Sequence, residues 1–149
     1  MMLYRFLPLP FVDNLDGEGA KKYGGRWNSK GFPIVYTSLS ISLALVELLV
    51  HCASINQLQL NHLAVIEVPS NLEQELITTP LQPNWRQDLK YSRSVGDAFI
   101  ASNSNLFLQI PSFIIPQENN ILINPMHKDF QSIKVKETLS FDFDLCFFK

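Results

Sequence analysis

A helix predicted from Ser38 or Ser40 to about Ala53 constrains this chain more than any other feature. Either serine offers a side-chain oxygen as an N-cap, and the residues that follow are apolar almost all round. A helix without a wide polar face is normally enclosed by the rest of the protein, so we expect this one to be buried. Glu47 is its only charged residue. A carboxylate in apolar surroundings is costly unless a cation, hydrogen-bond donors or a water-filled cleft accompanies it, so Glu47 should face one of these.

An arginine and a tyrosine lie shortly before this helix. The glycine pair 24–25 frees the backbone ahead of Arg26, and the β-branched and aromatic run 34–37 predicts a strand that contains Tyr36. Short turns keep consecutive elements adjacent in space. We therefore expect Arg26, Tyr36 and Glu47 to converge on one cleft, where they are suited to hold an anion, a flat ring and a developing positive charge.

The composition fits one ordinary globular domain. The chain has 149 residues, of which 46% are hydrophobic, so we expect a single domain over residues 1–149 with its own core. Its formal net charge is −2 and no block of lysines and arginines is present. Broad electrostatic binding to nucleic acid or to an acidic membrane is therefore disfavoured, although one well-placed arginine can still bind a phosphate.

Cysteine usage and apolar runs predict the cellular compartment. Cys52 and Cys146 lie far apart and form neither a CxxC pair nor a metal-ligand spacing, which is typical of free thiols in a reducing cytoplasm. The N-terminal residues lack the basic-then-apolar layout of a signal peptide, and the longest apolar run is too short to span a bilayer. We expect a cytoplasmic protein that does not bind membranes.

Two further kinds of site are disfavoured. His51, His62 and His127 are scattered without ligand spacing, so we predict no metal site. The polar segment 13–23 contains a Gly-Glu-Gly fragment, but Lys22 stands where a dinucleotide fingerprint needs its third glycine. We predict this segment as a loop and not as a phosphate-binding turn.

The remaining pattern predicts an α+β domain with mostly antiparallel strands. Proline residues separate several short apolar runs, and the last of them alternates apolar and polar residues as a half-buried strand does. The expected strands cover 3–9, 62–68, 106–110, 113–115, 120–123 and 139–145, and the expected helices cover 72–77, 92–101 and one turn within 126–133.

Motifs along nearly the whole chain resemble the RES domain family, which is named for an arginine, a glutamate and a serine. The motifs are GGRWNSKGFPIVYTS at 24–38, the helix with Glu47, Trp85-Arg86, VGDA at 95–98, IPS at 110–112 and ILINPMH at 121–127. The resemblance implies a fold like that of ADP-ribosyltransferases of the diphtheria-toxin type, with split antiparallel β-sheets and flanking helices.

The same resemblance implies an activity and a partner. A member of this family is expected to be the toxin of a type II toxin–antitoxin system that depletes cellular NAD+ by cleaving the nicotinamide–ribose bond, through hydrolysis or phosphorolysis. NAD+ is then a consumed substrate, and no cofactor is implied. The expected partner is an Xre-type helix-turn-helix antitoxin that covers the active site and binds DNA, so the toxin meets DNA only indirectly. A homodimer within a larger complex is compatible with this arrangement.

The name-giving residues of the family fall on Arg26, Glu47 and Ser112, and its motif tyrosine falls on Tyr36. The resemblance therefore predicts these four as catalytic residues. We also predict Arg26, Asn28 and Tyr36 as substrate-binding residues, with Asn28 chosen for its place beside Arg26.

For Arg26 and Tyr36 the residues themselves leave an alternative beside the catalytic role. The guanidinium of Arg26 can fork onto the NAD+ pyrophosphate or form a structural ion pair with Glu47 or Asp97. The ring of Tyr36 can stack on nicotinamide or pack as a core aromatic.

Glu47 is suited to stabilise the oxocarbenium character that builds as the bond from ribose C1′ to nicotinamide breaks, or to hold the 2′-hydroxyl. Its alternative is to tie the helix down, with His51 either orienting it or serving structure. Ser112 lies outside any nucleophile elbow, so we expect it to donate a hydrogen bond to the substrate, an active-site side chain or a turn. Asn28 is suited to contact the substrate or to make an Asx turn.

Two other functions stay open at this point. The same bond breaks when ADP-ribose is transferred onto a macromolecule, so an ADP-ribosyltransferase is an alternative. A non-catalytic module that binds a nucleotide or a protein partner is another.

Overall fold

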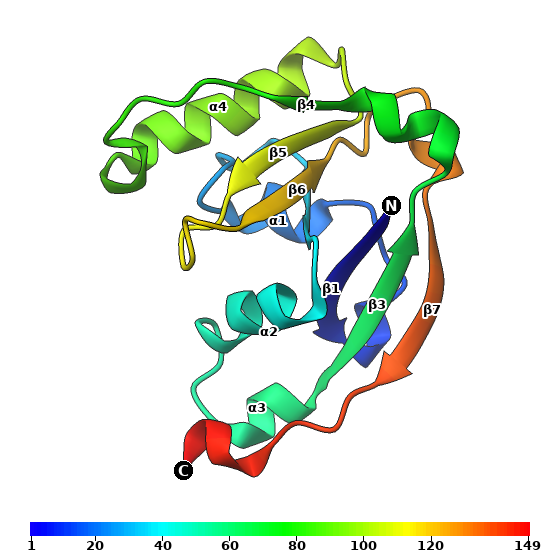
Figure 1. The fold of residues 1–149 in the computed structure, drawn as a ribbon, viewed down its shortest axis with the longest axis vertical. Coiled ribbons are helices and arrows are strands. Elements are labelled where there is room, and N and C mark those ends of the chain that lie inside the picture. Colours follow the sequence, from blue (N-terminus) through cyan, green and yellow to red (C-terminus); the bar gives the residue numbers. More distant parts are fainter.

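Seven strands form one sheet in the order β4-β5-β6-β2-β1-β3-β7, as the computed structural model of residues 1–149 shows (Figure 1). The strands are β1 (Met2–Pro8), β2 (Val35–Ser38), β3 (Asn61–Glu67), β4 (Leu76–Thr78), β5 (Phe107–Pro111), β6 (Asn119–Ile123) and β7 (Lys134–Ser140). The α-helices are α1 (Glu18–Tyr23), α2 (Ile41–Leu49), α3 (Ile55–Gln59) and α4 (Leu89–Ser102). Short 3-10 helices are η1 (Leu9–Phe11), η2 (Ser70–Glu75), η3 (Trp85–Gln87), η4 (Phe130–Ser132) and η5 (Leu145–Phe148).

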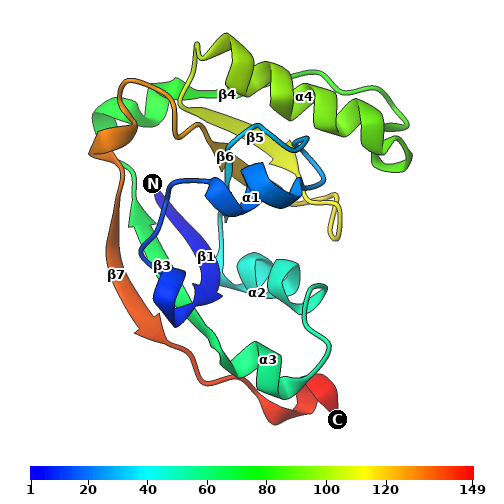
Figure 2. The same cartoon turned by 180° about the vertical axis from the view of Figure 1, so that it is seen from behind.

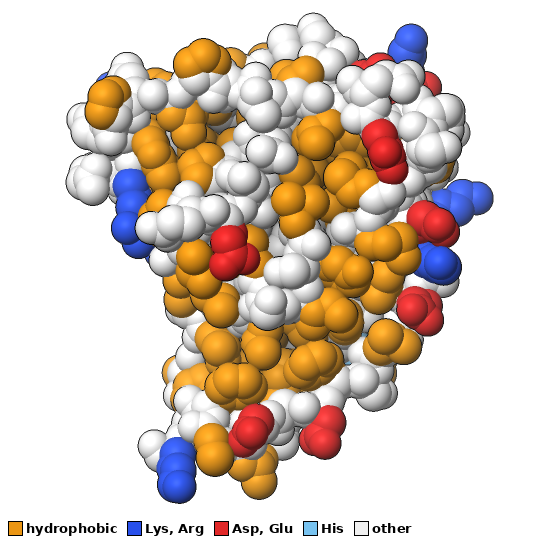
Figure 3. Space-filling model, in the orientation of Figure 1, with side chains coloured by type: hydrophobic (Ala, Val, Ile, Leu, Met, Phe, Trp, Pro, Cys, Tyr) orange, Lys and Arg blue, Asp and Glu red, His pale blue; other side chains and the backbone are white.

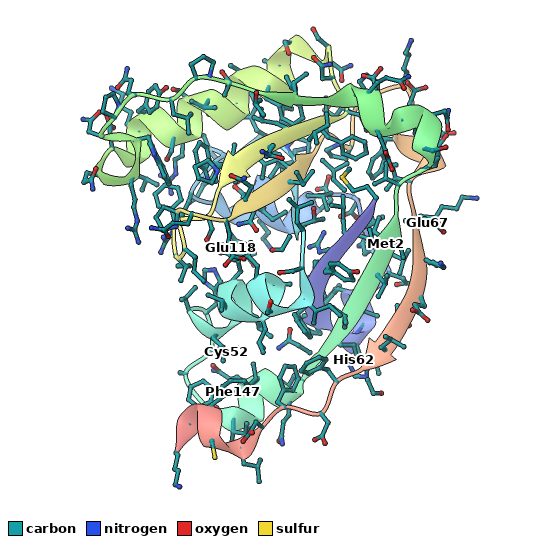
Figure 4. All side chains as sticks on the ribbon, in the orientation of Figure 1. Met2, Cys52, His62, Glu67, Glu118 and Phe147 are labelled. Atoms are coloured by element: carbon teal, nitrogen blue, oxygen red, sulfur yellow. The ribbon has the colours of Figure 1, made fainter.

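The sheet is divided at its middle. All neighbouring strands are antiparallel except β4 and β5, which are parallel. β1 pairs with β3 along its whole length, from Met2 opposite Glu67 to Pro8 opposite Asn61, and Figure 4 labels the first of these pairs at one end of the strands. By contrast, β1 and β2 are joined only at Tyr4 and Ser38. The expected α+β fold with mostly antiparallel strands is confirmed, and the split lies at this single junction.

Each half of the sheet has its own apolar cluster. α4 packs on β5 and β6 around Phe99, Leu108 and Leu122, while α2 and α3 pack on β1 and β3 around Phe6 and Leu63. A third cluster lies on the other side of the junction and joins both halves. Successive residues of a strand point to opposite faces, which is why neighbouring apolar residues of one strand serve different clusters.

The helix that carries Glu47 begins as predicted and is less buried than predicted. The Ser40 side chain accepts a hydrogen bond from the Leu43 N–H at 3.1 Å, which confirms the N-cap. The prediction that the whole helix is buried was wrong, because α2 covers only one side of β1 and β2. Leu43 is buried, whereas Ile41 and Val50 are 38% and 48% exposed. Figure 3 shows apolar side chains gathered on the molecular face where α2 and α3 lie.

Three other predictions were wrong for reasons of tertiary packing. Segment 13–23 contains α1, because the side-chain amide of Asn28 donates to the Ala20 carbonyl and fixes this short helix. Residues 113–115 form a turn after β5 and not a strand. Segment 139–145 leaves the sheet after Ser140, because Phe141 and Phe143 pack on the Phe6 ring at centroid distances of 5.1 and 5.7 Å.

The other expected elements have partly different bounds. The strands expected at 3–9, 62–68, 106–110 and 120–123 correspond to β1, β3, β5 and β6, and the helix expected at 92–101 lies within α4. The helix expected at 72–77 is the 3-10 helix η2, which begins two residues earlier, at Ser70, and ends at Glu75, where β4 follows from Leu76. The single turn expected within 126–133 is the 3-10 helix η4. None of the helices combines the length and the hydropathy that crossing a membrane requires.

Candidate active site

A cavity of about 1340 Å³ opens between α1, β1, α2 and the loop that carries Arg26. Figure 2, the view from behind, shows α1 and α2 beside β1. The side chains of Arg26, Tyr36 and Glu47 all line this cavity, which we call the cleft. The expected convergence of these three residues on one cleft is therefore present in the structure.

Glu47 lines the cleft with one carboxylate oxygen fixed and the other without a protein partner. Its Oε1 accepts a hydrogen bond from the Ser112 hydroxyl at 2.6 Å and another from the Asn120 side-chain amide at 2.7 Å. Glu47 forms no ion pair. Of the three surroundings expected for this carboxylate, the structure provides hydrogen-bond donors and a cleft, and it provides no cation in contact. The two donors orient the carboxylate and leave Oε2 available to a ligand.

Ser112 lies behind Glu47 and does not line the cleft. Its side chain is fully buried. Besides donating to Glu47, its Oγ accepts hydrogen bonds from the N–H groups of Ile114 and Ile115, each at 3.0 Å. Its own N–H donates to the Glu118 carbonyl, which closes the β5–β6 hairpin beside α2 (Figure 4). A hydroxyl with these partners positions the Glu47 carboxylate and is not free to act as a nucleophile.

Asn120 is a site residue that the sequence did not reveal. It lies on β6 opposite Ser38 of β2, and its Oδ1 accepts a hydrogen bond from the Ser38 hydroxyl at 2.7 Å. This bond fixes the amide so that its nitrogen points to Glu47. The available signal was a polar residue at the start of an otherwise apolar strand, which by itself also fits a strand end.

Arg26 projects from a tight reversal of the chain. The Gly25 N–H donates to the Asn28 carbonyl at 2.9 Å, which leaves Arg26 exposed while Trp27 is buried. The Arg26 guanidinium carbon lies 4.9 Å from the centroid of the Phe113 ring, a cation–π contact. It forms no ion pair, so the structural alternative expected for Arg26 is absent.

Tyr36 is held by its hydroxyl. That hydroxyl donates to Asn28 Oδ1 at 2.6 Å and accepts from the Trp27 N–H at 3.1 Å. Burial raises the pKa of Tyr36 above its ordinary value, with a smaller contribution from Asp97, while the Trp27 hydrogen bond and the charge of Arg93 oppose the shift. The phenol therefore stays neutral at physiological pH and remains a donor to Asn28.

Asn28 supports this arrangement from inside the protein. Its side chain is fully buried and does not line the cleft. Besides accepting from Tyr36, its amide nitrogen shares its two N–H groups among three backbone carbonyls, those of Ala20, Ser29 and Phe32. Direct contact with a substrate would require these bonds to break, so we assign Asn28 to positioning Tyr36 and α1.

Two further arginines line the cleft and were not singled out from the sequence. Arg5 lies on β1, where burial lowers its pKa to about 10 against the opposing charge of Asp16, so it is still a cation at neutral pH. Arg93 comes from α4. Neither forms an ion pair. For Arg5 the missed signal resembles that of Glu47, a lone charge within an apolar element.

The histidines contribute little to this site. His51 lines the cleft, but it is exposed and makes no hydrogen bond with Glu47. No group of three His, Cys, Asp or Glu side chains comes together as metal ligands would. The cleft therefore combines the oriented Glu47 carboxylate and the Tyr36 ring with three arginines that form no ion pair, and the charged residues Asp16, Glu18, Lys21 and Lys22 also line it.

The fold resembles that of a solved toxin. The chain matches one from the crystal structure of the Mycobacterium tuberculosis MbcT–MbcA toxin–antitoxin complex with a TM-score of 0.72, over 94% of this chain and 83% of that one. The sequence identity is 20%, so this likeness concerns the fold alone.

Similarity at the level of sequence is stronger. Toxin Res of Yersinia enterocolitica is 38% identical over 97% of both chains, and Toxin Res of Photorhabdus laumondii is 36% identical over 97% of this chain and 95% of its own. The Prs ADP-ribosylating toxin of a Sphingobium species is 40% identical over 89% of this chain and 86% of its own. The family model described as RES domain matches residues 2–144. This chain belongs to the RES domain family.

Proposed function

We propose that this protein is the toxin of a toxin–antitoxin system and that it cleaves the nicotinamide–ribose bond of NAD+, passing ADP-ribose to water or phosphate. The observation that carries this proposal is the state of Glu47, whose Oε1 is held by Ser112 and Asn120 while Oε2 is free in a cleft shared with Arg26 and Tyr36. Similarity to proteins named Toxin Res supports the toxin role.

The size and charge of the cleft suit a dinucleotide. Its volume of about 1340 Å³ exceeds the roughly 300–1,000 Å³ of common small-molecule pockets. Arg26 and Arg5 line it without ion-pair partners. A guanidinium binds phosphate oxygens through paired N–H donors, so these arginines are suited to the pyrophosphate of NAD+.

Tyr36 and Glu47 provide the groups that bond cleavage needs. In this proposal the ring of Tyr36 stacks on nicotinamide, and Oε2 of Glu47 faces the ribose. When the bond from C1′ to the pyridinium nitrogen breaks, its electron pair leaves with nicotinamide, which becomes neutral and needs no added proton. Positive charge moves to the ribose, where the Glu47 carboxylate stabilises it. Water or phosphate then adds to C1′, and water releases one proton. NAD+ is consumed, and the proposal requires no cofactor.

The test of this reaction is mass spectrometry of NAD+ breakdown, with and without phosphate, for the wild type and for Glu47→Gln. We expect the wild type to release nicotinamide together with ADP-ribose or its phosphorylated form. Glu47→Gln should lose about 100-fold or more in turnover, because the charge facing the ribose is gone. Glu118→Gln is a matched control, since Glu118 is an exposed acid that does not line the cleft. A Glu47→Gln protein with native circular dichroism and undiminished turnover would refute the proposal.

Transfer of ADP-ribose to a macromolecule is the second candidate, because one relative at 40% identity is named an ADP-ribosylating toxin. Incubation with labelled NAD+ separates the two reactions. Label on a macromolecule supports transfer, whereas free labelled ADP-ribose supports consumption. A protein that binds nucleotide but leaves NAD+ unchanged would instead be a non-catalytic binding module.

We propose an Xre-type helix-turn-helix antitoxin as partner in the cytoplasm, with DNA contacted only through it. The rim of the cleft supports a protein cover, since four exposed apolar side chains line it: Phe11, Tyr23, Val50 and Leu89, which are 55%, 69%, 48% and 43% exposed. The structural neighbour comes from a toxin–antitoxin complex, which agrees with such a partner. Co-expression with the neighbouring reading frame, followed by size-exclusion chromatography, tests this partner and the stoichiometry of the complex.

A further inference from the structure

Helix α4 holds the loop that carries Arg26 through contacts with consecutive residues of that loop. Arg93 Nε donates to the Gly25 carbonyl at 2.8 Å, and the Ser92 hydroxyl donates to the Arg26 carbonyl at 2.6 Å. One turn further along α4, Asp97 accepts the Ser29 N–H at 2.8 Å. Residues at this spacing share one face of a helix, so α4 presents a single surface to the loop.

Arg93 differs from Ser92 and Asp97 because its side chain also lines the cleft. Its side chain is half-buried, and Nε makes its one hydrogen bond to protein, so both terminal nitrogens have no partner. These nitrogens carry most of the N–H donors of a guanidinium and have the geometry that binds phosphate oxygens. Arg93 therefore has free donors directly beside the Arg26 loop.

The charges around Arg93 favour an anion at this place. Arg5, Arg26 and Arg93 line the same cleft, and none of them forms an ion pair. The charge of Arg93 also lowers the pKa of Tyr36 against the effect of burial, which places the guanidinium within electrostatic reach of the phenol. Asp16 opposes part of this charge at Arg5, but Arg26 and Arg93 have no carboxylate within ion-pair distance, so a bound anion lowers the repulsion among the three cations.

We propose that Arg93 is a further substrate-binding residue that places its terminal nitrogens on the pyrophosphate of NAD+ while Nε holds the Gly25 carbonyl. One side chain then contacts both the phosphate and the loop from which Arg26 projects. Phosphate binding and the placement of Arg26 are thereby linked through a single guanidinium. This inference rests on the proposed function, because it identifies the anion as the diphosphate of that substrate.

The experiment compares Arg93→Gln with Arg86→Gln. Arg86 is a matched control because its Nε also donates to a backbone carbonyl, that of Phe113, at the same 2.8 Å, but it does not line the cleft. Binding of ADP-ribose is measured by titration calorimetry, which needs no turnover, and the kinetics of NAD+ loss are measured alongside. Thermal melting and circular dichroism report the fold of each variant.

We expect Arg93→Gln to raise the Kd for ADP-ribose and the KM for NAD+ at least about tenfold, because a charge-assisted phosphate contact is lost. Affinity for nicotinamide, which has no phosphate, should stay unchanged. Arg86→Gln should keep the affinity for ADP-ribose even if its melting temperature falls. Arg93→Lys should recover part of the affinity, since it keeps the charge but has a single nitrogen for two partners.

Wild-type affinity for ADP-ribose in folded Arg93→Gln overturns the inference and leaves the proposed function intact. If Arg93→Gln does not fold, Arg93→Lys decides, because a folded lysine variant with unchanged affinity overturns the inference equally. A wild-type protein that neither binds ADP-ribose nor degrades NAD+ overturns the proposed function itself.

Discussion

Ser112, the residue that follows β5, donates a 2.6 Å hydrogen bond to Glu47 of α2, which lies 65 positions earlier in the sequence. The same hydroxyl accepts two backbone N–H groups of the turn that follows β5. Two of the three residues that name the family therefore act as one unit. The serine fixes the glutamate, and the glutamate faces the cleft.

Ser112→Ala should reduce turnover of NAD+ by about tenfold and not abolish it, because Asn120 still donates to Glu47. The variant should also lose about 1–3 kcal/mol in free energy of unfolding, since buried N–H groups lose their acceptor. Steady-state kinetics and urea unfolding measure the two effects. Complete loss of turnover in a folded Ser112→Ala protein would point to a nucleophilic serine and contradict the positioning role.

Asn120→Leu should lower kcat more than it raises KM, because the second donor to Glu47 disappears while the cleft arginines are untouched. The expected loss in unfolding free energy is about 1–3 kcal/mol, since the buried hydroxyl of Ser38 loses its acceptor. Asn119→Leu is the control, because Asn119 is the preceding residue of β6 and its side chain makes no hydrogen bond. Equal kinetic effects of the two substitutions would argue against a specific role for Asn120.

Gly96→Ala tests the contact between α4 and the Arg26 loop. A Cβ at this position would overlap the Trp27 carbonyl oxygen, a backbone atom that cannot move without moving the loop. We expect a lower melting temperature and a large loss of NAD+ turnover. Gly19→Ala is the control, because nothing lies within 4 Å of a Cβ there and alanine favours helix by about 1 kcal/mol. Native stability and activity in Gly96→Ala would show that α4 does not fix the loop.

The sequence was informative wherever a local pattern carried the information. A lone acid in an apolar segment led to Glu47, and a serine before that segment led to the N-cap at Ser40. The donors that hold Glu47 were not predictable in the same way. Asn120 lies 73 residues away and reaches Glu47 only because β6 pairs with β2 next to α2.

Patterns with more than one structural solution account for the remaining differences. Alternation of apolar residues at 139–145 fits a strand, but the same spacing lets Phe141 and Phe143 meet the Phe6 ring outside the sheet. Arg5 and Arg93 lie on a strand and a helix that are far apart in the sequence, and no local pattern links the two residues. Only the assembled fold places both of them in one cleft.

Alkaline stability tests the buried hydroxyl of Tyr36. Burial raises its pKa in the folded protein, whereas the unfolded chain has the ordinary value of about 10. Well below pH 10 the phenol is neutral in both states. As the pH rises through 10, the unfolded state loses its phenol proton first, so the free energy of unfolding falls until the folded phenol also ionises.

The Tyr36→Phe variant has no phenol hydroxyl to ionise at this position. We therefore expect wild-type stability to decline more steeply than that of Tyr36→Phe between pH 9 and pH 11, roughly one unit either side of the ordinary value, in urea unfolding. Parallel declines would mean that the phenol is open to solvent and that its bond to Asn28 does not hold the ring in place.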